Sequence, residues 1–302
     1  MAEVKSPGLS AHWLNGWLAA VGATVLVPGM RLRWTEDQTP VAVLSADHGN
    51  PVELISRAWP DRRRLAALPI AEEWCEERKM QRKVPLDRFT ARARATRGNP
   101  QSWALSATMT DLEVDQQGEV AHGPFDAAGP GTIKWLHHRL MRLHGSVDST
   151  TERIDASLAG RADRVSNSGL AFDQTRLGSM ADSTGTHLVD PAIEILGFFG
   201  LAIFPTRGKG IDSRAVRGAR PFAIQRGWSH VTGNAGRSRL CFRWPAWSQS
   251  LDALGIDALL DVWKPQKPKT WKRLGVRAGW QGVRFRRRGQ ADRTAAIASE
   301  RL

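Results

Sequence analysis

Residues 10–44, SAHWLNGWLAAVGATVLVPGMRLRWTEDQTPVAVL, decide how the fold begins. Apolar side chains recur at helical spacing between Trp13 and Val25, and Ser10 is the expected N-cap. Pro28 and Gly29 then end the helix. The next two apolar runs, 30–34 and 41–44, are separated by the polar residues TEDQ and predict a β-hairpin. We therefore expect an amphipathic helix packed on a β-hairpin.

Helical and strand patterns alternate along the rest of the chain without a regular βαβ period, which predicts an α+β fold. The expected architecture is the N-terminal helix and hairpin with helical insertions, a second and smaller α+β region, and a basic C-terminal extension. Asp190-Pro191 supplies a cap and a first-turn proline for a helix over residues 192–199. Other predicted elements are helices within 51–97, 132–144 and 250–262, and strands at 102–114, 201–204, 222–225 and 239–244.

Composition divides the chain into four expected ranges. Residues 1–147 form an N-terminal α+β domain, and residues 148–170 form a polar linker or surface excursion with few large apolar side chains. Residues 171–263 form the second α+β region. Residues 264–302 form a basic tail rich in Trp and Arg.

The positive charge of the chain is concentrated in its last third. Residues 205–302 carry 21 Lys and Arg against six acids, whereas residues 1–204 carry 22 basic against 24 acidic residues. Six of the 13 Trp lie in the same third. Cations interleaved with planar rings suit a phosphate backbone whose bases can stack, so we predict binding of RNA or single-stranded DNA.

The predicted nucleic-acid-binding residues all come from this basic third. They are Arg237, Arg239, Arg243, Lys264, Lys267, Lys269, Trp271, Lys272, Arg273, Arg277, Trp280, Arg284, Arg286, Arg287 and Arg288. Gly279 and Gly282 flank Trp280, and prolines precede Trp271, so both rings are expected near the surface, beside cations. The other interpretation, that the two rings cap a core, remains open at this point.

Motifs for catalysis are missing from the sequence. It has no phosphate-binding loop, no G-x-S-x-G, no H-E-x-x-H and no C-x-x-C pair, so we expect no catalytic residue, metal site or cofactor. A nuclease is the alternative: Asp61, Glu77 and Lys79 have the order of a metal-dependent nuclease motif, and His137, His138 and His144 cluster on one predicted helix. A scaffold that binds an acidic protein is a further alternative.

Two segments resemble a known family. Residues 189–207, VDPAIEILGFFGLAIFPTR, resemble a segment of CRISPR-associated proteins of subtype I-U, now called I-G, and residues 14–22, LNGWLAAVG, are similar to their first helix. The resemblance implies a large or accessory subunit of a Cascade-type interference complex. It further implies contact with guide RNA or target DNA, assembly with sister subunits, and no catalysis by this chain.

A cytoplasmic location without membrane contact is expected. Cys75 and Cys241 lie far apart in unlike contexts, so they suggest neither a disulfide framework nor a metal site. The apolar stretch 13–27 is too short to span a bilayer and contains Asn15. The basic stretch 264–288 has no apolar stripe at helical spacing, and Pro265, Pro268 and several glycines would interrupt an interfacial helix.

Overall fold

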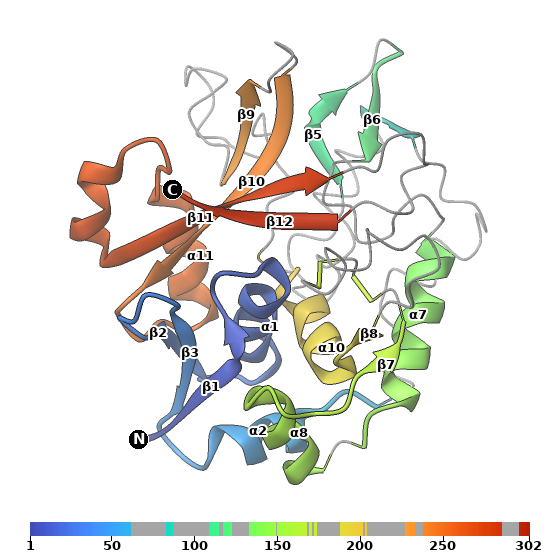
Figure 1. Cartoon of the computed structure of the whole chain (residues 1–302), viewed down its shortest axis with the longest axis vertical. Helices are drawn as coiled ribbons and strands as arrows, with labels where there is room; N and C mark the ends of the chain where they lie inside the picture. The colour runs from blue at the N-terminus through green and yellow to red at the C-terminus, as the bar shows by residue number, and fades with distance from the viewer. Residues whose placement is uncertain are drawn as a thin grey trace.

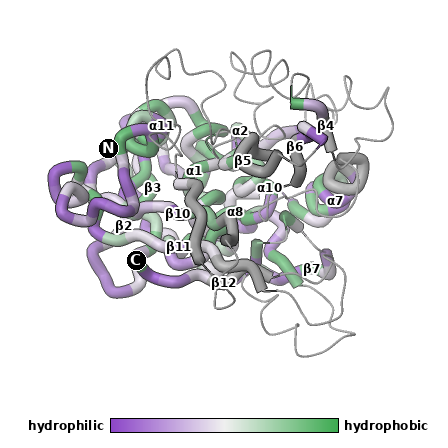
Figure 2. The backbone as a smooth tube through the Cα atoms, turned by 90° about the horizontal axis from the view of Figure 1, so that it is seen from above, coloured by the Kyte–Doolittle hydropathy of each residue, from purple (hydrophilic) through white to green (hydrophobic). Residues whose placement is uncertain are grey.

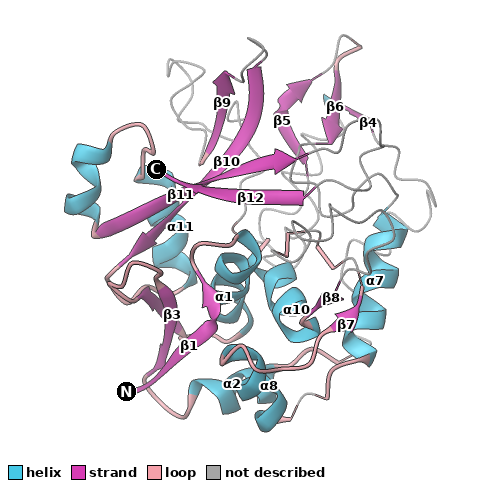
Figure 3. Cartoon of the chain, viewed as in Figure 1, coloured by secondary structure: helices cyan, strands magenta, loops and turns pink. Residues whose placement is uncertain are grey.

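The computed structural model combines helices with antiparallel sheets, which confirms the α+β class (Figures 1 and 3). It describes residues 1–61, 83–86, 109–114, 117–122, 133–148, 150–167, 169, 170, 172, 173, 188–201, 203, 227–232, 238–285 and 296–302. The predictions for residues 222–225 and for most of 62–108 lie outside the described residues.

The N-terminal part is a three-stranded antiparallel sheet beside a buried helix. Strands β2 (Arg31–Trp34) and β3 (Val41–Ala46) form the predicted hairpin, and β1 (Ala2–Ser10) pairs with the other edge of β3. Helix α1 (Leu14–Leu26) is buried along nearly its whole length. It is therefore a core helix rather than the expected amphipathic one.

The predicted N-cap at Ser10 is wrong. Ser10 is the last residue of β1, and its hydroxyl accepts a hydrogen bond from the His12 amide at 3.2 Å. Trp13 occupies the N-cap position without a side-chain cap, and the helix begins at Leu14. The reason is the preceding strand, which a local helical pattern does not show.

Helix α10 (Pro191–Gly200) crosses α1 at the centre of the molecule (Figure 1). Asp190 caps it as predicted, since its carboxylate accepts the amides of Ala192 at 2.9 Å and Ile193 at 3.4 Å. Leu201 continues in helical conformation as the C-cap, so the strand predicted from that residue does not begin there.

The C-terminal third forms a four-stranded antiparallel sheet in the order β12-β11-β10-β9. Its strands are β9 (Trp228–Thr232), β10 (Ser238–Trp247), β11 (Val276–Phe285) and β12 (Ala296–Arg301). Between β10 and β11 the chain forms helix α11 (Ala253–Val262), as predicted, and the 3₁₀-helix η3 (Pro268–Leu274).

The remaining elements lie around α10 and at the edge of the molecule. Helix α2 (Pro51–Ala58) contacts α8 (Thr151–Leu158), and the predicted helix α7 (Ile133–Gly145) contacts α10. The short strands β7 (Val165–Ser166) and β8 (Leu188–Val189) pair, and β4 (Lys83–Pro85), β6 (Glu119–His122) and β5 (Met109–Val114) form a third sheet.

One hydrophobic core joins residues from the expected ranges 1–147, 171–263 and 264–302. Buried tryptophans link its two halves, because their indole N–H groups donate to carbonyl oxygens across it: Trp17 to Pro245 at 2.9 Å, Trp244 to Ala11 at 2.8 Å and Trp247 to Leu32 at 3.0 Å. Ile154 and Leu158, from the range expected as a linker, are also buried in this core. The domain boundaries themselves stay a prediction.

Candidate nucleic-acid interface

Residues 264–273 form a basic segment that two tryptophans anchor to the sheet. The rings of Trp263 and Trp271 lie 5.6 Å apart, and the Trp271 indole donates a hydrogen bond to the Lys264 carbonyl oxygen at 3.1 Å. Both rings contact the backbone at Gly279, where a Cβ would lie 3.0 Å from Trp271. The segment is therefore held at both ends by buried aromatic side chains, at the left edge of Figure 1.

The 3₁₀ period explains why the cations of this segment point outward. In a 3₁₀-helix, residues three apart share a face. Trp271 and Leu274 share the face that packs on the core, which leaves Lys269 with Lys272 on a second face and Arg273 on the third. Lys264, Lys267, Lys269, Lys272 and Arg273 are all exposed, and Figure 2 shows this end of the molecule as predominantly hydrophilic.

These five cations differ from the basic residues of the N-terminal sheet in their pairing. Lys5, Arg31 and Arg33 each lie within 3.5 Å of a carboxylate. By contrast, none of the five cations of the basic segment forms an ion pair within the part of the chain that the structure describes. Residues 263–275 also contain no acid. No acidic side chain within the segment itself therefore offsets its positive charge.

A polar row crosses the solvent-facing side of the four-stranded sheet next to this segment. Arg243 on β10 pairs in register with Gln281 on β11, which pairs with Glu300 on β12. The Arg243 Nε donates to the Gln281 side-chain oxygen at 2.9 Å, and the Gln281 amide nitrogen donates to Glu300 at 3.3 Å. Sequence reasoning included Arg243 but missed Gln281 and Glu300, because only strand pairing brings them together.

The remaining predicted arginines are only partly placed. Arg277 is exposed on β11, with an Nη nitrogen 3.5 Å from the carboxylate of Glu36. Arg239 and Arg284 lie in β10 and β11. The remaining four, Arg237, Arg286, Arg287 and Arg288, lie outside the described residues.

The expectation that Trp271 and Trp280 lie near the surface is wrong. Their exposed fractions are 8% and 1%. Trp280 pairs with Trp244 across β11 and β10 on the core side of the sheet, and Gly279 accommodates the Trp271 ring on the other side. Gly279, which suggested that the rings are exposed, is instead the position on which the Trp271 ring packs. Trp244, Trp247 and Trp263 are buried as well. Most tryptophans of the basic third are therefore not exposed for stacking with bases.

The residues of the nuclease alternative do not form a site among those described. The Nε2 of His144 donates to the Pro60 carbonyl oxygen at 2.7 Å, His138 is exposed on α7, and His137 belongs to the same helix. Asp61 is exposed, whereas Glu77 and Lys79 lie outside the described residues. No group of three or more His, Cys, Asp or Glu that could hold a metal is found within the described ranges.

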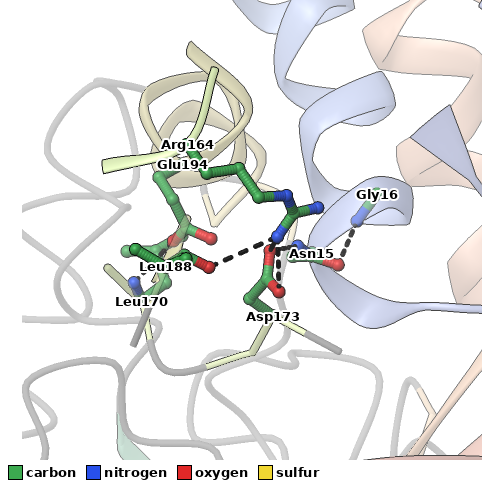
Figure 4. Close-up of polar contacts among 7 residues, drawn as sticks. All are labelled: Asn15, Gly16, Arg164, Leu170, Asp173, Leu188 and Glu194. Carbon is green, nitrogen blue, oxygen red and sulfur yellow. Dashed lines mark hydrogen bonds and ion pairs between the residues drawn. The ribbon is translucent and has the colours of Figure 1, made fainter. Parts of the chain in front are cut away.

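A polar cluster between α1 and α10, in which Asn15, Asp173 and Glu194 are buried and Arg164 is exposed, is occupied by internal contacts (Figure 4). Arg164 donates to both Asp173 oxygens at 3.0 and 3.1 Å, and the Asn15 amide donates to the same carboxylate at 3.0 Å. Glu194 on α10 accepts the Leu170 amide at 2.6 Å. These contacts tie Leu170 and Asp173 to the two central helices, and we assign the cluster a structural role.

Comparison of the chain with protein-family models, with curated proteins and with solved structures finds no match. Among the helices that the structure describes, none combines the length and the apolar character needed to cross a bilayer.

Proposed function

We propose that this chain binds RNA or single-stranded DNA without cleaving it, and that the basic segment 264–273 contacts the phosphate backbone. The observation that carries the proposal is the set of five exposed cations without a carboxylate partner among the described residues, on a segment fixed by Trp263 and Trp271. Because Trp263 and Trp271 already fix the backbone of this segment, only the side chains have to be ordered when it binds phosphates, which favours binding to a polyanion.

We further propose that the chain acts in the cytoplasm as a subunit of a CRISPR-associated antiviral defence complex. This proposal rests on the resemblance of residues 14–22 and 189–207. The first segment lies in α1 and much of the second lies in α10, the two helices that cross at the centre of the fold. Affinity purification from the native host should recover sister subunits and short repeat-derived RNA. Recovery of the chain alone would contradict the subunit proposal.

Salt-dependent filter binding tests the nucleic-acid proposal. Labelled single-stranded oligonucleotides of DNA and RNA are titrated between low and moderate salt with the wild type and with a variant that carries Gln at positions 264, 267, 269, 272 and 273. Each phosphate contact that is lost should reduce the slope of log affinity against log salt by about 0.7. Arg57→Gln, which removes a cation paired with Glu53 on α2, is the matched control and should leave the slope unchanged.

The same preparations distinguish the alternatives. Cleavage of the labelled strand with added divalent metal, abolished by Glu77→Ala or His138→Ala, would favour the nuclease. An interaction that survives nuclease treatment of a lysate, combined with no oligonucleotide binding at low salt, would favour the scaffold that binds an acidic protein.

A further inference from the structure

The solvent-facing side of the four-stranded sheet places one arginine in a defined orientation. Arg243 lies between the buried residues Phe242 and Trp244, so its side chain is on the face opposite to the core. Gln281 lies between the buried residues Trp280 and Gly282 and shares that face. The two residues are cross-strand partners, and their side chains are joined by the 2.9 Å bond from Arg243 Nε.

The hydrogen bond to Gln281 leaves the outer edge of the guanidinium free. Within the described part of the chain, the two Nη atoms of Arg243 form no hydrogen bond, and neither is among the buried atoms that lack a partner. Both therefore keep some solvent-accessible surface. Because Gln281 is neutral, it orients the guanidinium without cancelling its charge, and its own amide is fixed by Glu300 at 3.3 Å.

Such an arrangement suits a phosphate. Two parallel N–H donors on a planar guanidinium match two oxygens of a phosphate, and a lysine at the same place supplies only a point charge. We infer that Arg243, positioned by Gln281, binds a phosphodiester group of a single-stranded nucleic acid on the open face of the sheet. This inference rests on the proposed function and extends the interface beyond the basic segment.

The location is continuous with the basic segment. Trp263 and Trp271 pack on Gly279, and Gly279 pairs with Pro245 across the two strands. This pair lies on the same face of the sheet as the pair of Arg243 and Gln281, and it is the next pair along the strands on that face. Rows two residues apart are separated by about 7 Å along a strand. A strand of nucleic acid held by the basic segment is therefore near Arg243.

Three substitutions in the full-length chain test the inference, with labelled oligo(dT) and oligo(U) as probes. Arg243→Gln should weaken binding about tenfold and lower the salt slope by about 0.7, because one charge-assisted contact is lost. Arg243→Lys should keep the slope but lose several-fold in affinity. Gln281→Leu should also keep the slope and lose affinity, since the charge remains but its orientation does not. Arg57→Gln is again the control.

The outcomes separate this inference from the proposed function. If Arg243→Gln binds like the wild type while the five-site Gln variant has lost binding, the inference is wrong and the basic segment alone is the interface. If the five-site variant also binds like the wild type, the basic segment is not the interface, and if the wild type binds neither probe at low salt, the proposed function itself fails. Should Arg243→Gln not fold, Arg243→Lys and Gln281→Leu decide: wild-type affinity in both would overturn the inference.

Discussion

At the scale of single residues, the strand face on which a tryptophan lies determines whether its ring is buried, and the charged residues beside it in the sequence do not. Trp280 lies between Arg277 and Arg284 in the sequence, yet alternation along β11 directs its ring to the core, where it approaches His12 at 6.4 Å. The exposed cations of η3 lie on the other side of the same sheet. A basic composition and a buried aromatic cluster thus occupy the same segment without sharing a surface.

Trp280→Ala should therefore act on stability. A buried Trp replaced by Ala leaves a cavity, and we expect a loss of about 3–5 kcal/mol in the free energy of unfolding. Urea denaturation measures this loss, with the exposed Lys269→Ala as the control for an unburied side chain. Oligonucleotide affinity of the folded fraction should stay at the wild-type value. Tenfold weaker binding at unchanged stability would instead assign Trp280 to base stacking.

At the scale of elements, the start of α10 combines a predicted cap with an environment that the sequence did not reveal. Asp190 is buried, and the loss of water around it raises the pKa of its carboxyl group. Hydrogen bonds from Ser157, Ala192 and Ile193 and the charge of Arg153 act in the opposite direction but do not outweigh burial. The folded state therefore favours the protonated form of Asp190, and ionisation of this carboxyl group lowers the free energy of unfolding.

Asp190→Asn should change how stability depends on pH. A carboxyl group whose pKa is raised in the folded state contributes stability that is fully present below its ordinary value of 3.8 and is lost as pH rises through the folded pKa. Asparagine keeps an acceptor for the helix amides but does not titrate. Urea curves between acid and neutral pH give the free energy of unfolding of both proteins. The value for the wild type minus the value for Asp190→Asn should decrease as pH rises.

Asp252→Asn makes the same chemical change at the exposed N-cap of α11 and controls for the loss of one carboxylate. A stability difference between wild type and Asp190→Asn that grows with pH would mean that the folded state lowers the pKa of Asp190 instead of raising it.

At the scale of the whole molecule, two glycines decide how closely the central helices approach. A Cβ at Gly200 of α10 would overlap the Leu18 carbonyl oxygen of α1, and one at Gly22 of α1 would overlap the Leu196 carbonyl oxygen of α10. Both helices are buried almost throughout, so they cannot separate without opening the core. The contact joins two segments that lie far apart in the sequence.

Gly200→Ala should thus destabilise the fold. Overpacking at a rigid backbone contact costs about 1–3 kcal/mol, or more where the helices cannot adjust. Gly145→Ala, at the end of α7 with no atom within 4 Å of the added methyl group, is the matched control. Thermal and urea unfolding compare the two variants, and equal midpoints would show that the α1–α10 contact tolerates the methyl group.

The sequence by itself determined the features that depend on neighbouring residues. Apolar spacing located the helix around Trp17 and the hairpin after it, Asp190-Pro191 located the start of α10, and charge counting located the basic last third of the chain. Helix periodicity, capping and charge are local properties, so a local pattern is sufficient to predict them.

Only the tertiary structure decided the third strand β1, the burial of Trp271 and Trp280, and the meeting of Arg243 with Gln281 and Glu300. Strand β1 depends on its pairing with β3, and the other features depend on pairing between β10 and β11, which residues 248–275 separate, and on which face of each strand meets the core. A shift of one residue in that register would turn Trp280 outward and Gln281 inward. Register is fixed by packing across the whole core, so no local pattern contained it.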